Sequence, residues 1–368
     1  MSSRVLSLRK VESGRPGKVY YPLQLGREEG RSKPGPNQVL VQLRAAALNH
    51  RDLFQRRHLY PGIAFDRAIL SDGSGVIRAV GDDVSSFRVG DEVIFSPVRG
   101  WIADPVGPEP GDDSWGVTGG SLNNDFGTAR DYMVVDAVDI EPKPSHLSAV
   151  EAAALPLAGV TAWRAVVTKA KCEEGQNVLI TGIGGGVALH ALQFVVSLKA
   201  KAFVTSGDDD KISRARKLGA EAGVSYRLPN WDSQLRALLP SSRPYLDAII
   251  DGAGGDIIRR ALTLLKPGGV VVQYGMTLAP SMNWSILAVL SNLELKGSCL
   301  GSRREFADMV AFVNKHKLRP VVYRTVRGLD NLKAINGLFD EMSMGTQFGK
   351  LVIEIDGDAL QAEATPRL

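Results

Sequence analysis

The stretch from Val178 to Phe194 reads VLITGIGGGVALHALQF and is the most informative part of the chain. Three apolar residues lead into four glycines within five positions, and apolar residues at helical spacing follow. A strand, glycine turn and helix let backbone N–H groups approach a pyrophosphate closely, and the positive end of the helix dipole favours its charge. The stretch therefore predicts a dinucleotide-binding turn formed by Gly182, Gly184, Gly185, Gly186 and Val187.

The spacing of these glycines departs in one place from the common fingerprint. Val187 stands where a third glycine usually brings helix and strand close together. Gly186 and Ala188 are small neighbours that can provide this close packing with a slightly shifted turn. We therefore expect the coenzyme site to be retained.

After Thr161 the chain alternates short apolar segments with amphipathic helical segments. Six of the segments read as strands, at 178–180, 201–206, 223–227, 246–252, 270–275 and 293–298. This alternation predicts an α/β fold of the Rossmann type, a doubly wound parallel sheet with helices on both faces.

The remainder of the chain has a different pattern. From Pro34 to about residue 155 it shows short alternating strands with many Gly and Pro turns, and 349–355 (GKLVIEI) reads as a closing strand. We expect that strand to return to the first part of the chain. The predicted Rossmann domain, residues 159–300, is then inserted into a β-rich catalytic domain made of residues 1–158 and 301–368.

The end of the second predicted strand bears on the choice of coenzyme. An acidic residue there normally binds the 2′-hydroxyl of the adenosine ribose, and its absence leaves room for a 2′-phosphate. Ser206 stands at that position, and Lys211 and Tyr226 are further candidates for binding a phosphate. The acidic run 208–210 is unfavourable beside a phosphate, and we interpret it as the cap of the next helix. NADPH is therefore expected in preference to NADH.

Composition excludes several classes of protein. Of the 368 residues, 44% are apolar and 23% charged, as in ordinary globular proteins, and no apolar stretch is long enough to span a bilayer. Cys172 and Cys299 match neither a disulfide framework nor a four-cysteine zinc site, which favours a reducing, cytoplasmic location. The net charge of +4 is spread along the chain, so no nucleic-acid partner is expected. The last residues, 366–368 (PRL), loosely resemble a peroxisomal address.

Several dispersed segments resemble the medium-chain dehydrogenase/reductase superfamily, and within it the zinc-independent branch that is similar to quinone oxidoreductases. They are AALNHRDL at 46–53, ILSDGSGVIRAVG at 69–81, VGDEVI at 89–94, FGTARDYMVV at 126–135 and EAAALPLAGVTAWRAV at 151–166. Together with the glycine turn and GKLVIEI, they follow the order of the family over nearly the whole chain. The resemblance implies a GroES-like catalytic domain, a Rossmann domain and a homodimer.

The resemblance also bears on metal binding. Zinc-dependent relatives have a cysteine in the segment that matches AALNHRD and a His-Glu pair in the segment that matches LSDGSG. Asn49, Ser71 and Asp72 stand at these positions here. A catalytic zinc needs three good protein ligands such as Cys and His. We therefore expect an enzyme without zinc.

Carried over residue by residue, the resemblance places a group of side chains and loops around the coenzyme, most of them beside its nicotinamide half, with Gly252 in a loop near the ribose and Lys350 reaching the coenzyme from the catalytic domain. These are Thr161, Gly252, Gly275, Met276, Ser302, Arg303 and Lys350. It also places Asn49 and Tyr60 in the catalytic site, with Asp52 orienting their loop. On the residues alone, Asn49 is as well explained as a turn or capping residue and Tyr60 as a partly buried aromatic. Both interpretations stay open at this point.

Without a metal, hydrogen-bond donors have to polarise the carbonyl of the substrate, and the protein mainly positions the hydride donor and acceptor. We therefore expect NADPH-dependent reduction of a quinone, enone or other conjugated carbonyl, with donors holding the oxyanion. Two alternatives remain open. One is an enoyl reductase that acts on thioester or polyketide chains, and the other is a non-catalytic NADPH-binding sensor.

Overall fold

The computed structural model describes residues 2–12, 14–29, 33–109, 115–124 and 126–355. The chain divides into two compact units. Unit 1 consists of Met1–Leu157 and Ser302–Leu368, and unit 2 consists of Ala158–Gly301. The tripeptide 366–368, which resembles a peroxisomal address, lies outside the described residues.

Unit 2 is built around a six-stranded sheet in the order β12, β11, β10, β13, β14, β15. The strands are β10 (Asn177–Ile180), β11 (Lys201–Ser206), β12 (Ala222–Ser225), β13 (Leu246–Asp251), β14 (Leu265–Gln273) and β15 (Glu294–Gly297). All neighbouring pairs are parallel, and the strand order reverses at β10. The predicted doubly wound parallel sheet is confirmed, and its ligand site is expected at that reversal.

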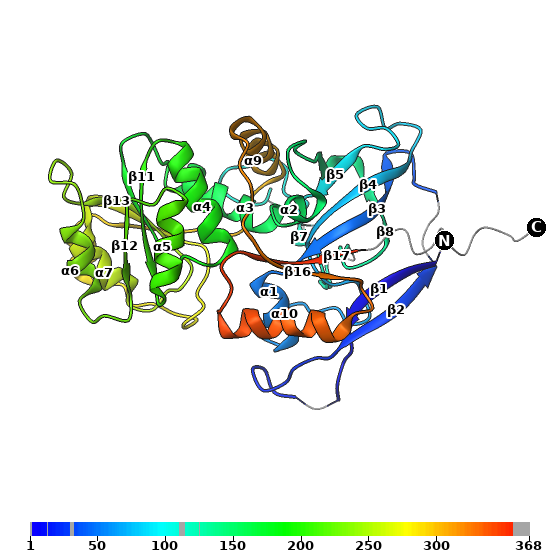
Figure 1. The fold of residues 1–368 in the computed structure, drawn as a ribbon, viewed down its shortest axis with the longest axis horizontal. Coiled ribbons are helices and arrows are strands. Elements are labelled where there is room, and N and C mark those ends of the chain that lie inside the picture. Colours follow the sequence, from blue (N-terminus) through cyan, green and yellow to red (C-terminus); the bar gives the residue numbers. More distant parts are fainter. Residues whose placement is uncertain (1, 13, 30–32, 110–114, 125, 356–368) are drawn as a thin grey trace, which may run out of the picture. The chain divides into compact units, whose positions relative to one another are not determined.

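Helices stand on both sides of this sheet (Figure 1). They are α4 (Gly186–Ser197), α5 (Asp209–Lys217), α6 (Trp231–Ala237), α7 (Ile257–Leu264) and α8 (Ile286–Leu290). A buried cluster joins strand residues such as Leu179 and Phe203 to helix residues such as Leu235 and Ile258. Before β10, α3 (Pro156–Trp163) runs into a π-helical segment, η2 (Arg164–Lys169). Strands covered on both faces need a nearly continuous apolar composition, and the central strands β10 and β13 are buried along their whole length.

Unit 1 is β-rich, as predicted. Its main sheet has the order β16, β17, β3, β4, β5, β9, and β8 pairs with β3 in addition. The strands are β3 (Gln38–Ala47), β4 (Asp72–Val80), β5 (Glu92–Phe95), β8 (Tyr132–Asp136), β9 (Ile140–Pro142), β16 (Val322–Arg327) and β17 (Lys350–Glu354). Two small sheets pair β1 (Ser2–Leu8) with β2 (Leu23–Glu29) and β6 (Val98–Arg99) with β7 (Gly116–Val117).

The closing strand returns to the first part of the chain. β17 pairs antiparallel with β3, so that Val352 lies opposite Ala47. This pairing confirms the predicted return of GKLVIEI. It also brings Lys350, the first residue of β17, to the end of β3, where the site described below begins.

The helices of unit 1 were mostly not predicted from the sequence. They are α1 (His50–Arg56), α2 (Ala149–Ala153), η1 (Ala137–Asp139), α9 (Arg303–His316) and α10 (Leu332–Met344). α1 and α2 are too short to show a helical period, whereas α10 has a readable start and end in its N-cap Asn331 and in Gly345. α10 packs against α1 and β2 (Figure 1), and none of the described helices has the length and apolar character needed to cross a membrane.

Candidate functional site

The glycine turn joins β10 to α4 in unit 2. Gly182 has a φ of 63° and Gly184 a φ of 144°, a region that other residues rarely adopt. Gly185 is the N-cap of α4, so the N–H groups of Gly186 and Val187 belong to the first turn and have no acceptor within the helix. Gly185, Gly186 and Val187 are partly exposed. The turn thus offers N–H groups and a positive helix end to an anion, which fits the pyrophosphate of a dinucleotide.

A buried carboxylate ties together the loops that follow three neighbouring strands. Asp251, at the end of β13, accepts hydrogen bonds from Thr181 Oγ1 at 2.5 Å and from Gln273 Nε2 at 2.7 Å. It also accepts the N–H of Gly254 at 2.7 Å. Sequence reasoning named Gly252 in this loop and missed Asp251. The available signal was an acidic residue at the end of a buried strand, directly before glycines.

The predicted nicotinamide loops of unit 2 lie beside this carboxylate. A Cβ atom on Gly252 would meet the ring of Tyr274 at 2.5 Å, and one on Gly275 would lie 3.2 Å from the carbonyl oxygen of Gly252. The structure therefore brings Gly252, Gly275 and the following Met276 together at the carboxyl ends of β13 and β14. Thr161 is buried in α3 of the same unit.

The residues predicted to bind the adenosine ribose come together at the carboxyl ends of β11 and β12. Ser206 ends β11, Lys211 lies in the first turn of α5, and Tyr226 follows β12. A Cβ atom on Gly207 would lie 2.7 Å from the Tyr226 hydroxyl and 3.0 Å from Arg227 Nε. The side chains of Tyr226 and Arg227 therefore both lie over the backbone that follows Ser206. Sequence reasoning missed Arg227, whose signal was its place directly after Tyr226.

Ser206, Lys211, Tyr226 and Arg227 form a corner at the carboxyl ends of β11 and β12. The acidic run 208–210 beside this corner has the capping role that the sequence suggested. Asp208 is the N-cap of α5, and its side chain accepts the N–H of Asp210 at 2.9 Å. The Ser206 hydroxyl accepts the N–H of Asp208 at 3.1 Å. Burial lowers the pKa of Lys211, against the attraction of Asp208. The corner thus combines a neutral hydroxyl at position 206 with two basic side chains.

In unit 1, Lys350 forms the centre of a buried polar network. Its Nζ donates to Asn49 Oδ1 at 2.6 Å, to Asp72 Oδ2 at 2.8 Å and to the carbonyl oxygen of Leu48 at 2.8 Å. These contacts use all three N–H bonds of the ammonium group. A contact between Lys350 and the coenzyme would have to share one of these N–H bonds with its present acceptor. The predicted contact stays a prediction.

Asn49 and Asp72 complete the network. Asn49 Nδ2 donates to Asp72 Oδ2 at 2.9 Å, and Asp72 Oδ1 accepts the N–H of Leu157 at 2.7 Å. Because the amide of Asn49 accepts from Lys350 and donates to Asp72, only one of its two flipped orientations satisfies both neighbours. Asp72 is fully buried, and its charge is paired with the buried ammonium, as an interior charge requires.

Asp52 fixes the start of α1. Its Oδ2 accepts the backbone N–H of Asn49 at 2.7 Å as part of a capping box, which confirms that Asp52 orients this loop. Burial raises the pKa of Asp52 to about 6, although Arg51 and the N–H of Asn49 favour the charged form. Burial also lowers the pKa of His50, which favours the neutral imidazole. The ionisable groups in the first turn of α1 are therefore buried at the cost of much of their hydration.

The positions that hold zinc ligands in zinc-dependent relatives do not form a zinc donor set here. Asn49 and Asp72 bind the ammonium of Lys350, and the Ser71 hydroxyl donates to the carbonyl oxygen of Thr118 at 2.6 Å. An amide, a hydroxyl and one carboxylate beside an ammonium are poor zinc ligands compared with thiolate and imidazole. Among the residues that the structure describes, no three His, Cys, Asp or Glu side chains are grouped to hold a metal ion.

Tyr60 lines an open hollow of about 400 Å³ in unit 1. The other residues around it are His58, Leu59, Pro61, Gly62, Ile63, Phe65 and Leu122. The Arg51 guanidinium lies 5.0 Å from the centroid of the Tyr60 ring. A mostly apolar lining of this kind suits the hydrocarbon part of a small organic ligand.

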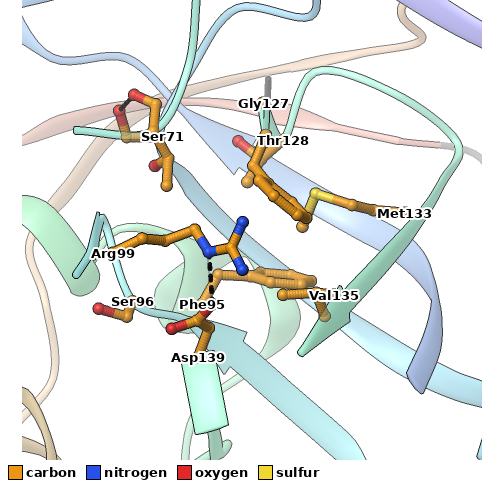
Figure 2. Close-up of a pocket in the computed structure, with 11 residues that line it drawn as sticks. Ser71, Phe95, Ser96, Arg99, Gly127, Thr128, Met133, Val135 and Asp139 are labelled. Carbon is orange, nitrogen blue, oxygen red and sulfur yellow. Dashed lines mark hydrogen bonds and ion pairs between the residues drawn. The ribbon is translucent and has the colours of Figure 1, made fainter. Parts of the chain in front are cut away.

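A much smaller cavity lies inside unit 1 (Figure 2). Its volume is about 10 Å³, and Ser71 and Thr128 line it together with the pair in which Arg99 Nε donates to Asp139 at 2.7 Å. That volume holds about one water molecule. We therefore exclude this cavity as a substrate site.

Ser302 and Arg303 make structural contacts within unit 1. Ser302 is the N-cap of α9, and its hydroxyl accepts the N–H of Glu305 at 3.2 Å. Arg303 Nη2 donates to the carbonyl oxygen of Ile140 at 2.9 Å and to the carboxylate of Glu141 at 2.5 Å. Both residues thus hold the start of α9, and their coenzyme contacts stay predictions.

Two family models match this chain. The model described as "Alcohol dehydrogenase GroES-like domain" matches residues 35–145, and the model described as "Zinc-binding dehydrogenase" matches residues 186–315. The first match confirms the expected GroES-like domain. The second begins at the helix that follows the glycine turn and does not include Asn49, Ser71 or Asp72.

Individual proteins are similar over most of the chain. The Zinc-type alcohol dehydrogenase-like protein YogA of Leptosphaeria maculans is 50% identical over 352 residues, which cover 94% of this chain and 98% of that protein. The Quinone oxidoreductase of Pseudomonas aeruginosa is 26% identical over 273 residues, which cover 74% of this chain and 75% of that protein. A crystal structure of an NAD-dependent alcohol dehydrogenase aligns with a TM-score of 0.81 at 29% identity and covers 96% of this chain and 99% of the other.

The pKa of Asp52 leads to a prediction about stability. The carboxyl binds its proton more tightly in the folded state, with a pKa of about 6, than in the unfolded chain, where about 4 is normal. It therefore lowers stability progressively as pH rises from about 4 to about 6, by about 3 kcal/mol in all. The variant Asp52→Asn keeps an acceptor for the N–H of Asn49 but has no carboxyl to titrate. Its unfolding free energy minus that of the wild type should therefore increase as pH rises from about 4 to about 6. Urea unfolding at pH 4.5, 5.5 and 6.5 measures it, with the exposed Asp83→Asn as control. A gain for Asp52→Asn that does not change with pH would contradict the raised pKa.

Proposed function

Because this chain belongs to the medium-chain dehydrogenase/reductase superfamily and is an oxidoreductase, we propose that it is an NADPH-dependent, zinc-free enzyme that reduces quinones, enones or other conjugated carbonyls. The observation that carries the proposal is the buried network of Lys350, Asp72 and Asn49. Asn49 and Asp72 stand at positions where zinc-dependent relatives have metal ligands, and both bind the ammonium group of Lys350. The ammonium supplies a positive charge there, and the amide of Asn49 supplies a hydrogen-bond donor.

Asn49 is the proposed donor to the substrate oxygen. Its Nδ2 carries two hydrogens, and one of them is directed to Asp72. Lys350 holds the other end of the amide, so that Nδ2 and not Oδ1 faces away from the ammonium. The second hydrogen then serves a carbonyl oxygen as negative charge develops on it. Lys350 is thus a positioning residue that also contributes positive charge, and Asn49 is the catalytic residue.

The glycine turn and the corner at Ser206 are the proposed coenzyme site. The N–H groups of Gly186 and Val187 bind the pyrophosphate, and Lys211 and Arg227 bind the 2′-phosphate of NADPH. When bound, the coenzyme supplies the hydride. A conjugated substrate suits this site because reduction places negative charge on an oxygen, where one amide donor stabilises it, and solvent protonates the product.

Within the proposed function, the first prediction concerns Asn49. Removal of a single oxyanion donor typically lowers kcat by about 10² to 10³. We expect Asn49→Ala to lower kcat for NADPH oxidation by simple quinones and enones by that amount while NADPH still binds. The N-cap residue of α6, Asn230, has no side-chain cap bond, and Asn230→Ala is the matched control with unchanged kcat.

The same assay separates the rival functions. Turnover of crotonyl-type thioesters with none of quinones or simple enones would favour the enoyl reductase, and tight NADPH binding without any turnover would favour the sensor. Activity that is lost on treatment with a strong chelator and restored by zinc would contradict the zinc-free proposal.

The second prediction concerns the coenzyme. Hydrogen bonds to a charged group contribute about 1.5 to 3 kcal/mol. We therefore expect Arg227→Ala to raise the KM for NADPH about tenfold or more and to leave the KM for NADH unchanged. Ser206→Asp places a carboxylate where it repels the 2′-phosphate and accepts from the ribose, and it should reverse the preference. Arg236→Ala, an exposed arginine of α6, is the control. Equal changes for both coenzymes, or a wild type that prefers NADH, would contradict the assignment.

We also propose that unit 2 mediates a homodimer. β15 is an edge strand of the sheet, and α8 before it exposes Ile286, Leu287, Val289 and Leu290. Antiparallel pairing of two copies of β15 centred on Leu295 places Glu294 of one copy opposite Lys296 of the other. Edge pairing satisfies open backbone groups, and the exposed apolar side chains supply hydrophobic contact.

The third prediction follows from this surface. Leu290 is 71% exposed, so Leu290→Glu should leave folding intact and convert a dimer into a monomer. Size-exclusion chromatography with light scattering at micromolar concentration measures the mass. Leu238→Glu, at a half-exposed leucine of the same unit, is the control that should stay dimeric. A wild type that is monomeric under these conditions would contradict the proposal.

A further inference from the structure

Arg51 is a buried cation of α1, and the protein uses only part of its guanidinium. The residue is 7% exposed. Nη1 donates to Ser71 Oγ at 2.9 Å and to the carbonyl oxygens of Thr118 and Gly119 at 2.8 Å each. Nε and Nη2 are also buried, and neither has a hydrogen-bond partner in the part of the chain that the structure describes. Buried N–H groups nearly always have an acceptor, so this edge of Arg51 calls for one.

Arg56, on the same helix, shows how a purely structural arginine is arranged here. Its Nε donates to the carbonyl oxygen of Tyr21 at 3.0 Å, and its Nη2 donates to Asn336 Oδ1 at 2.8 Å. Nε and Nη2 form an edge of the guanidinium that can bind a carboxylate through two parallel hydrogen bonds. Protein acceptors fill that edge in Arg56, where Nη1 is the nitrogen without a partner among the described residues. In Arg51 no acceptor from the described residues fills the same edge.

The surroundings of Arg51 favour an anionic group with a hydrocarbon body. The ion pair between Arg51 Nη1 and Asp52 Oδ1 is long, at 3.4 Å, and burial raises the pKa of that carboxyl to about 6. Asp52 therefore contacts only the Nη1 side of the guanidinium, and Nε and Nη2 have no carboxylate beside them among the described residues. The guanidinium also lies against Tyr60, which lines the mostly apolar hollow of about 400 Å³.

We propose that Nε and Nη2 of Arg51 bind a carboxylate of the substrate, so that the enzyme prefers conjugated carbonyls that carry a carboxyl group, such as 4-oxo-2-alkenoic acids, over their neutral esters. This inference rests on the proposed function and narrows its substrate class. The hydrocarbon part of the acid lies along Tyr60, and the conjugated carbonyl remains the reacting group at Asn49.

A water molecule is the rival occupant of this edge. Gln55, one turn along α1, donates from Nε2 to the carbonyl oxygens of Gly119 and Gly120, and its buried Oε1 has no partner among the described residues. A water molecule can accept from Arg51 and donate to Gln55, whereas a carboxylate has no hydrogen to donate. The two occupants predict different substrate preferences, because a resident water gives no advantage to an acid.

The test compares 4-oxo-2-pentenoic acid with its methyl ester, using the full-length enzyme and NADPH. We expect the wild type to have a kcat/KM for the acid about tenfold or more above that for the ester, as the loss of charge-assisted hydrogen bonds implies. Arg51→Gln should remove this preference by lowering kcat/KM for the acid, mainly through KM, with less than about a twofold change for the ester. Arg51→Lys keeps the positive charge but lacks two parallel N–H donors. Its preference for the acid should lie between that of the wild type and that of Arg51→Gln.

Arg56→Gln is the matched control, because it also removes a buried arginine from α1. It should lower the melting temperature without changing the ratio of kcat/KM for the acid to that for the ester.

Binding of the saturated 4-oxopentanoate and of its methyl ester, measured by calorimetry on the wild type, gives a readout that needs no turnover. Tighter binding of the acid supports the inference even if Arg51→Gln does not fold. Equal binding and equal kcat/KM for acid and ester overturn it and leave a bridging water as the occupant. Absence of turnover with every conjugated carbonyl, together with selective binding of the acid, would instead overturn the proposed function alone.

Discussion

The buried contact between Lys350 and Asp72 is the constraint on which the catalytic half of this enzyme depends. Moving two charges out of water costs several kcal/mol for each ion, and the contact offsets this cost only if the remaining hydrogen-bonding positions are filled. Here the ammonium has three acceptors, and both carboxylate oxygens have donors. The two residues are 278 positions apart, so β17 has to pair in register with β3 before the amide of Asn49 acquires its orientation. Closure of the β-rich unit therefore also orients the amide of Asn49, the proposed donor.

Much of the fold could be predicted because its signals are local. Most of the six strands of unit 2 are short apolar runs between a turn and a helix, and all six were predicted within a few residues of their observed places. The largest boundary error is in β14, which begins at Leu265 and not at Val270. Pro267, Gly268 and Gly269 read as a turn, yet Leu265 still pairs with Leu246 across a register shift. Irregular pairing of this kind is fixed by the neighbouring strand, which a local pattern does not contain.

The candidate site likewise combines local features, which the sequence predicts, with long-range contacts, which it does not. The glycine turn and Ser206 are local features of a strand and the helix after it, so the sequence predicts their placement at the coenzyme corner. Arg227 and Arg51 were missed, because an arginine in a sequence is most simply a solvated surface charge. What singles out Arg51 is that it is buried with an open guanidinium edge, and that property depends on Ser71 and on carbonyl oxygens far along the chain. Long-range contacts of this kind leave no periodicity or spacing to read.

The charges around α1 explain how such a site can work with hydrogen bonds in place of a metal. Asp72 neutralises Lys350, whereas Arg51 has only a long contact to Asp52, a carboxyl whose pKa burial has raised. Near Asn49, Nε and Nη2 of Arg51 have no acceptor among the described residues, so this edge of the guanidinium can receive the carboxylate proposed for Arg51. A zinc ion also supplies positive charge, but its binding free energy stabilises the site only when metal is present. Lysine and arginine supply positive charge without a metal, but their burial costs desolvation free energy. Hydrogen bonds to the backbone carbonyl oxygens of Leu48, Thr118 and Gly119 offset part of this cost when unit 1 folds. In the proposed zinc-free enzyme, such a site is limited by the precision of its polar contacts.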